Sequence, residues 1–120
     1  MGRINKQLSY GEAPYDIHVE VYSVGDDIFA VVTGGTRPHV GAVALAEPLR
    51  DQKVRPLDPP RSLTAEGHKD TIIAEMFAQA LCEKYGVNVC VSAGVHVDDA
   101  SKEEIALMVE NAEALLGLII

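Results

Sequence analysis

Three short segments hold most of the residues that could bind or act on another molecule. Three of the four histidines stand in them, one in each: His39 in GGTRPHVG, His68 in EGHKD and His96 in SAGVHVDD. Near neutral pH an imidazole can hold a proton, a metal ion or a hydrogen bond to an anion. A single histidine is more often a packing or surface residue, so these three indicate a function only if their turns meet in space.

The segment GGTRPHVG combines residue types that suit a small anion. Gly34 and Gly35 can adopt positive φ and expose consecutive backbone N–H groups. Arg37 adds a planar guanidinium that fits phosphate or carboxylate, and Pro38 fixes the backbone between it and His39. Such a turn can cradle an anion, although it can also be a strand connection with an incidental arginine. It matches neither the P-loop pattern nor the dinucleotide-binding glycine pattern.

The other two segments stand where helices are expected to begin. Lys69, in EGHKD, lies beside a helix N-terminus, where acids are favoured, and this misplaced charge indicates a binding role. Asp98 and Asp99 follow His96 at the start of the second helix. The two aspartates can satisfy the helix start, or they can hold a divalent cation together with His96.

Charge is distributed unevenly along the chain. The formal net charge is −8, which argues against general nucleic-acid binding because phosphate contacts need clustered cations. The middle segment of the chain, residues 37–69, contains four acids and six cations. The cations are Arg37, Arg50, Lys53, Arg55, Arg61 and Lys69. This local excess of positive charge suits one anionic small molecule, but a solvated loop would have the same composition.

From these patterns we predict a single pocket that binds an anionic small molecule. Its expected residues are Gly34, Gly35, Arg37, His39, His68, Lys69 and His96. No nucleophile–base pair of recognised spacing is present, and neither Cys82 nor Cys90 is marked as reactive. We therefore expect a non-catalytic binding protein with free thiols and no metal site. A histidine-dependent metalloenzyme is the less favoured alternative.

The first half of the chain has the pattern of strands. Residues 16–35 contain two runs rich in Val, Ile, Phe and Tyr, separated by Gly25, Asp26 and Asp27, which predicts a hairpin. VGAVALAEP is expected to be a third strand paired after the GGTRPHVG turn. RINKQLSYG, near the start, is expected to be an edge strand. The proline-rich positions 48–67 exclude a helix or a central strand, so we expect a long loop there.

The second half alternates between helical and strand patterns. Apolar residues recur at helical spacing after Gly67, and Gly86 stands where a C-terminal cap belongs. VNVCVSAG is predicted to be a central strand covered on both faces. Ser101 and Glu104 form a capping-box pattern for a second helix. The order predicts one α+β domain over residues 1–120, with two helices covering a mostly antiparallel sheet.

The C-terminal sequence LLGLII suggests self-association. One face of this helix already serves the core, so Leu115, Leu118 and Ile120 are expected to be exposed in a monomer. An exposed apolar patch of this kind favours a homodimer, or a surface for another protein. The chain has no signal-peptide core and no long apolar stretch that could cross a membrane, so we expect a cytoplasmic protein.

Taken together, GGTRPHVGAVALAEP, GHKDTIIAEMFAQAL and VSAGVHVDDASKEEI resemble the LpdD-like prenylated flavin chaperone domain family over residues 15–115. Members accompany UbiD-type decarboxylases, and related domains resemble proteasome-assembly chaperones in fold. The resemblance implies a non-catalytic chaperone that binds prenylated flavin mononucleotide (FMN) or delivers it to such a decarboxylase. A protein-interaction or assembly-chaperone module without a small ligand remains the alternative.

Overall fold

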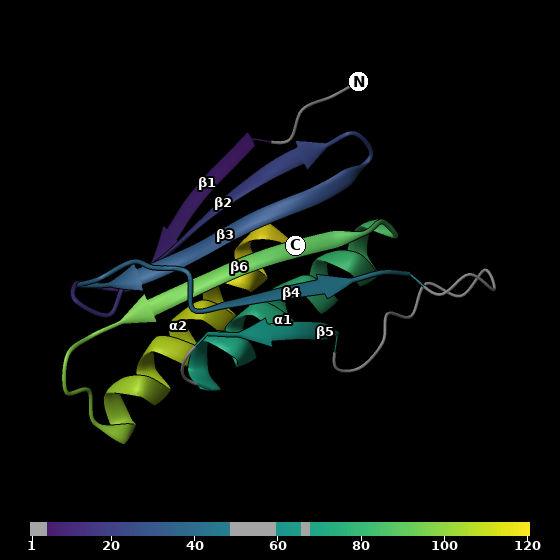
Figure 1. Cartoon of the computed structure of the whole chain (residues 1–120). Helices are drawn as coiled ribbons and strands as arrows, with labels where there is room; N and C mark the ends of the chain where they lie inside the picture. Colours follow the sequence, from purple (N-terminus) through teal and green to yellow (C-terminus); the bar gives the residue numbers. More distant parts are fainter. Residues whose placement is uncertain (1–4, 49–59, 66–67) are drawn as a thin grey trace.

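The structure, a computed structural model, describes residues 5–48, 60–65 and 68–120. These residues form one six-stranded sheet and two helices (Figure 1). The elements are β1 (Asn5–Tyr10), β2 (Ile17–Val24), β3 (Asp27–Gly35), β4 (Ala42–Ala46), β5 (Arg61–Thr64), α1 (His68–Tyr85), β6 (Val89–His96) and α2 (Lys102–Ile119). The strands lie in the order β1-β2-β3-β6-β4-β5. The predicted α+β class and mostly antiparallel sheet are confirmed, because only the β3–β6 pair is parallel.

The hairpin of β2 and β3 forms as the alternating pattern predicts. Every second residue of β2 is buried from Ile17 to Val21, and β3 alternates in the same way from Ile28 to Val32. The turn between the two strands contains Gly25, whose φ of 59° is the conformation that glycine adopts without strain. β1 pairs with β2 and forms the expected edge strand.

The position of β6 differs from the expected pairing of the third strand. β4 does not pair with β3 across the GGTRPHVG turn; β6 lies between them, parallel to β3 and antiparallel to β4. The turn therefore crosses the end of β6, which places its residues beside His96. The expected loop at 48–67 also contains a short strand, β5, at the sheet edge. The rest of that segment, at 49–59 and 66–67, lies outside the described residues.

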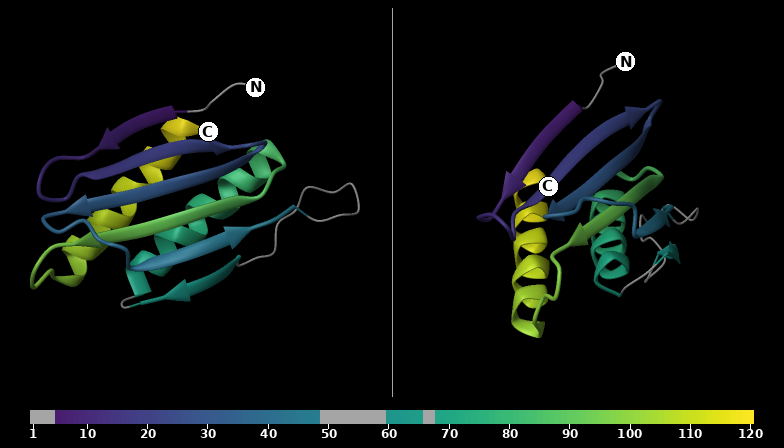
Figure 2. Two further views of the ribbon diagram at one scale, coloured as in Figure 1. Left: turned by 45° about the horizontal axis from the view of Figure 1, so that its top comes forward. Right: turned by 60° about the vertical axis from the view of Figure 1, so that its left-hand side comes forward.

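Both helices pack on one face of the sheet, as Figure 2 shows. The core combines alternate strand residues such as Val32 and Val91 with Phe77 and Leu81 of α1 and Met108 of α2. β6 is central, as predicted, but because both helices lie on the same face of the sheet, no helix of the described residues covers its second face. Ser92 and Gly94 alternate onto that second face and are nevertheless buried.

The helix ends follow the sequence signals. Gly86, at φ 67°, follows the last residue of α1 and donates its N–H to the carbonyl of Cys82. Ser101 caps α2 by accepting the N–H of Glu104, and the Glu104 carboxylate accepts the N–H of Ser101 in return. Tyr15, in the loop before β2, donates its hydroxyl to the same carboxylate and ties the start of α2 to the sheet.

The end of α2 corrects one expectation about the C-terminal residues. Leu115 is fully buried in the core, and Ile119 is nearly so, whereas Leu118 and Ile120 are exposed as predicted. The expectation that Leu115 is exposed is therefore wrong, because the core-facing side of the helix is wide enough to include it. Within the described residues, no helix is long and apolar enough to span a membrane. Both cysteines are free thiols, and burial raises the pKa of each.

Candidate functional site

A pocket of about 540 Å³ lies where β3 leaves the sheet, β6 ends and α1 begins. Four of the predicted site residues line it, namely Arg37, His39, Lys69 and His96, together with Pro38, Val40, Gly41, Ala65 and Asp70. His68 is the first residue of α1, but its side chain lies outside the described part. Gly34 and Gly35 end β3 and are not among the lining residues. The volume falls in the range of small-molecule sites.

Hydrogen bonds join the backbone of the GGTRPHVG turn to the end of β6. The N–H groups of Thr36 and Arg37 both donate to the carbonyl of His96, at 2.8 and 3.3 Å. The N–H of Gly35 donates to the carbonyl of Asp16 at 3.3 Å. These three amides are thus engaged within the protein. The expected row of free backbone donors for an anion is not found at these residues, so recognition in this pocket falls to side chains.

Two glycines allow the turn to lie this close. A Cβ on Gly94, in β6, would collide with the carbonyl oxygen of His39. A Cβ on Gly41 would collide with the carboxylate of Asp70. Gly41 also donates its N–H to the carbonyl of Ala93 at 2.8 Å. The shape of the pocket therefore depends on close backbone approach on both sides of the turn.

Asp70 is a fully buried carboxylate at the base of the pocket, which the sequence analysis did not select. Its Oδ1 accepts the N–H of Val95 at 3.0 Å, and its Oδ2 lies 3.1 Å from Nε2 of His39. The amino group of Lys69 is 3.9 Å from Oδ1, and the first turn of α1 favours a negative charge there. Asp70 thus joins α1, β6 and the turn. An acid in the first turn of a helix, shortly before its apolar residues begin, is the signal that could have identified it.

The His39 ring is held between two acceptors. Its Nδ1 lies 3.1 Å from the carbonyl oxygen of Arg37, and its Nε2 faces Asp70. A neutral imidazole carries one N–H and can serve only one of these acceptors, whereas the doubly protonated ring serves both. Each ring nitrogen therefore faces an acceptor within the protein. His39 fixes the turn and is not free to donate to a ligand without losing one of these bonds.

Arg37 and His96 form the rim of the pocket together with Asp98. The Oδ1 atom of Asp98 lies 2.9 Å from Nη2 of Arg37 and 2.8 Å from Nε2 of His96. The hydrogen bond from His96 and the positive charge of Arg37 lower the pKa of the Asp98 carboxyl. The expectation that Asp98 satisfies the start of α2 is wrong, because Ser101 does so. No group of three or more metal-ligating side chains is present among the described residues.

The cations of the middle segment do not all belong to the pocket. Arg61 pairs with Glu47 across the β4–β5 edge and does not line it. Arg50, Lys53 and Arg55 lie outside the described residues. Within the described part, the positive charge at the pocket comes from Arg37 and Lys69, to which a protonated histidine can add.

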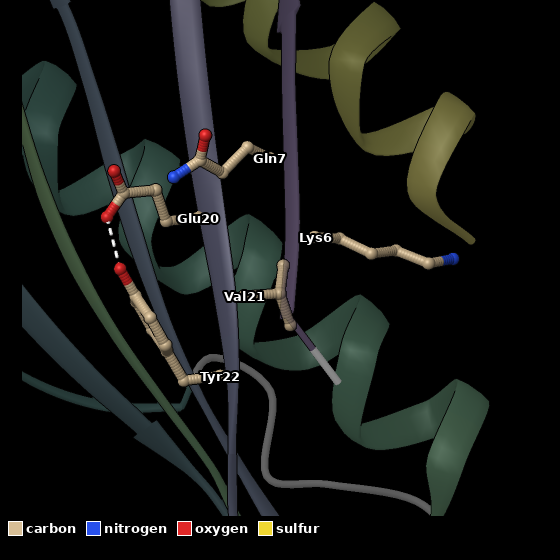
Figure 3. Close-up of a pocket in the computed structure, with 5 residues that line it drawn as sticks. All are labelled: Lys6, Gln7, Glu20, Val21 and Tyr22. Carbon is tan, nitrogen blue, oxygen red and sulfur yellow. Dashed lines mark hydrogen bonds between the residues drawn. The ribbon is translucent and has the colours of Figure 1, made fainter. Parts of the chain in front are cut away.

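A second hollow, of about 360 Å³, lies at the far edge of the sheet (Figure 3). Glu20 accepts the hydroxyl of Tyr22 there, and Gln7 points to the same side. Lys6 and Val21 point to the opposite side of the two strands. Because its lining is divided between two faces, this hollow does not converge on one ligand, and the pocket at the end of β6 is the better site.

Comparisons with known proteins agree with this architecture. A family model described as the prenylated flavin chaperone LpdD-like domain matches residues 11–120. Protein LpdD of Lactiplantibacillus plantarum is 33% identical over 96 residues, which cover 79% of this chain and 68% of that protein. A chain from a chaperone complex for yeast 20S proteasome assembly superimposes with a TM-score of 0.67 at 16% identity. That alignment covers 99% of this chain and 93% of the other, and it shows a shared fold.

Proposed function

The chain belongs to the family of LpdD-like prenylated flavin chaperone domains, and from this membership we propose that it binds prenylated FMN and delivers it to a UbiD-type decarboxylase. In this proposal the protein itself turns over no substrate. The cofactor is bound transiently in the pocket at the end of β6.

The observation that carries the proposal is the pair of donors on the pocket rim. Arg37 and His96 come from segments 59 positions apart, yet their Nη2 and Nε2 atoms lie 3.2 Å from one another. Two such donors can share one anionic oxygen, and a guanidinium suits the phosphate of a flavin mononucleotide. Lys69, which lines the same pocket, adds a second fixed positive charge. We therefore assign the cofactor phosphate to this rim.

The composition of the pocket also favours binding over catalysis. Among the described residues that line it there is no serine, threonine or cysteine that could act as a nucleophile. The His39–Asp70 pair has the form of an oriented base, but the second nitrogen of His39 is engaged by the carbonyl of Arg37. Within the described residues, the role of this pair is to hold the turn in place.

Co-expression with a UbiD-type decarboxylase tests the proposal. The decarboxylase is purified after expression with and without this protein, under conditions where prenylated FMN is made, and its bound cofactor is quantified by absorbance and mass spectrometry. We expect higher cofactor loading and activity when the wild-type chain is present. An Arg37→Gln variant should give less, while Arg61→Gln, with the same charge change outside the pocket, should match the wild type. Equal loading in all samples would reject cofactor delivery.

One feature favours a second role as a protein-interaction module. The sheet face opposite the helices exposes apolar side chains, among them Leu63 at 81% exposure, Leu45 and Tyr22. Exposed apolar patches on sheets commonly mark partner surfaces. A delivery chaperone must also contact its client, so this face is compatible with both roles. A protein that binds the decarboxylase but no flavin would fit the interaction module alone.

A further inference from the structure

One carboxylate oxygen receives both donors of the pocket rim. Oδ1 of Asp98 lies 2.9 Å from Arg37 Nη2 and 2.8 Å from His96 Nε2. These are ordinary lengths for charge-assisted hydrogen bonds to a carboxylate. His96 must carry its proton on Nε2 to donate here, and its contact with Arg37 is then only one of proximity. The oxygen is thus held by the same two donors that we assign to the cofactor phosphate.

A carboxylate oxygen and a phosphate oxygen are nearly equivalent to these donors. Both carry negative charge and accept the same N–H groups at similar distances. We propose that Asp98 is an internal competitor, which occupies the phosphate position in the empty protein and is displaced when the ligand binds. This inference rests on the proposed function and adds to it a residue that sets how tightly the cofactor is held and how fast it leaves.

The solvent exposure of Arg37 and Asp98 determines whether Asp98 or the ligand phosphate binds Arg37 more strongly. The side chains of Arg37 and Asp98 are 69% and 72% exposed, and ion pairs between groups this open contribute little. A phosphate monoester carries up to two charges and offers several oxygens to a guanidinium fork. The ligand can therefore displace Asp98 at a small cost. When no ligand is bound, Asp98 keeps Arg37 and His96 in position at the rim of the pocket.

The location of Asp98 permits this exchange. It follows β6 in the turn before the Ser101 cap and belongs to no strand or helix. Turning its side chain away breaks no contact of the core. The lowered pKa of the carboxyl, caused first by the His96 hydrogen bond and then by Arg37, keeps it ionised at neutral pH. Asp98 is therefore a charged competitor at neutral pH.

Asp99 provides a matched control for the loss of charge. It is exposed, it is the next residue in the chain, and it occupies φ 53°, a conformation that asparagine tolerates. Asp98→Asn and Asp99→Asn each remove one negative charge from the same exposed turn, so both reduce the through-space repulsion of an anionic ligand. Only the first substitution also weakens a direct competitor for Arg37 and His96. The difference between the two variants isolates that competition.

The test measures binding of prenylated FMN under anaerobic conditions, by calorimetry for Kd and by stopped-flow fluorescence for release. Compared with Asp99→Asn, we expect Asp98→Asn to bind about three- to fivefold more tightly, from the value of an exposed ion pair, and to release the cofactor correspondingly more slowly. Asp98→Ala should behave in the same way. Equal affinities for Asp98→Asn and Asp99→Asn would overturn the inference. So would weaker binding by Asp98→Asn, since Asp98 would then support Arg37 in the complex.

The wild type and Arg37→Gln separate this inference from the proposed function. If the wild type binds no prenylated FMN, the proposed function fails, and the inference fails with it. If the wild type binds and Arg37→Gln binds as well, the phosphate lies elsewhere, and competition by Asp98 is rejected while flavin binding stands. If Arg37→Gln weakens binding but Asp98→Asn matches Asp99→Asn, only the inference is rejected.

Discussion

The imidazole rings of His39 and His96 meet edge to face, with their centroids 6.2 Å apart and their planes at 86°. One ring belongs to the turn after β3 and the other to the last residue of β6. The contact brings the turn and the strand end together at side-chain level, in addition to the backbone bonds from Thr36 and Arg37 to His96. The two histidines therefore form a direct side-chain contact between the two walls of the pocket.

Replacing Arg37 by glutamine should weaken the binding of prenylated FMN. The loss of a charge-assisted hydrogen bond is expected to cost about 1.5–3 kcal/mol, with the lower end favoured because the side chain is largely exposed. Calorimetric titration measures this change. Arg61→Gln removes the same charge at the β4–β5 edge and should leave the affinity close to that of the wild type. Unchanged affinity in Arg37→Gln would assign Arg37 to the surface.

Gly41→Ala should destabilise the protein because the new methyl group would collide with the buried carboxylate of Asp70. We expect a loss of about 1–3 kcal/mol of unfolding free energy. Asp70→Ala should also destabilise, since the N–H of Val95 loses its acceptor, but it makes room for the methyl group. Urea denaturation of both single variants and the double variant measures the coupling. Strict additivity would show that the two positions do not meet as described.

Acid should remove the stability that Glu104 provides. The pKa of Glu104 is lowered first by the hydrogen bond from Tyr15 and then by Ser101, so the folded state favours the ionised form. This contribution is complete above the unfolded pKa of about 4.3 and is lost as pH falls through the lower folded value. Glu104→Gln should therefore be less stable than the wild type at pH 7, and the difference should shrink in acid. Glu103→Gln, at an exposed neighbouring position, should show a smaller difference that varies less with pH in urea titrations.

We expect the protein to form a homodimer through the end of α2. Leu118 is 60% exposed there, and Ile120 is also exposed. Light scattering should give about twice the chain mass of 12.9 kDa at micromolar concentration, and Leu118→Glu should give the monomer. Leu63→Glu, on the open sheet face, serves as the control and should remain dimeric. The opposite result would move the interface to the sheet, and a monomeric wild type would reject the dimer.

Local patterns in the sequence were sufficient to predict most of the helices and strands. The β2–β3 hairpin, the Gly86 cap and the Ser101–Glu104 capping box each depend on residues close together in the chain. The pairing of β6 between β3 and β4 depends on contacts across more than forty positions, about which local periodicity says nothing. The convergence of Arg37 and His96 follows from that insertion. The sequence indicated which residues to expect in the pocket. Only the structure shows that the turn from β3 to β4 passes the end of β6 and so brings these residues together.

The burial of Asp70 shows the same limit at the level of one side chain. An acid in the first turn of a helix is ordinarily solvated, and composition alone does not reveal that the turn folds over it. The close approach allowed by Gly41 and Gly94 buries it. Free backbone donors were expected at Gly34 and Gly35, but the N–H of Gly35 donates to the carbonyl of Asp16, which the sequence does not identify as a neighbour. Pairings of this kind depend on the packed structure.

The place of β6 in the sheet also fixes when the pocket can exist. During synthesis, β3, the turn and β4 emerge long before the strand that lies between β3 and β4. Until β6 inserts, Arg37 has no His96 beside it, and the N–H groups of Thr36 and Arg37 lack the His96 carbonyl that accepts them. Such non-local insertion is among the slower events in folding. A nascent or partly opened chain therefore lacks the complete pocket, and under the proposed function it accepts a flavin only after its own sheet is complete.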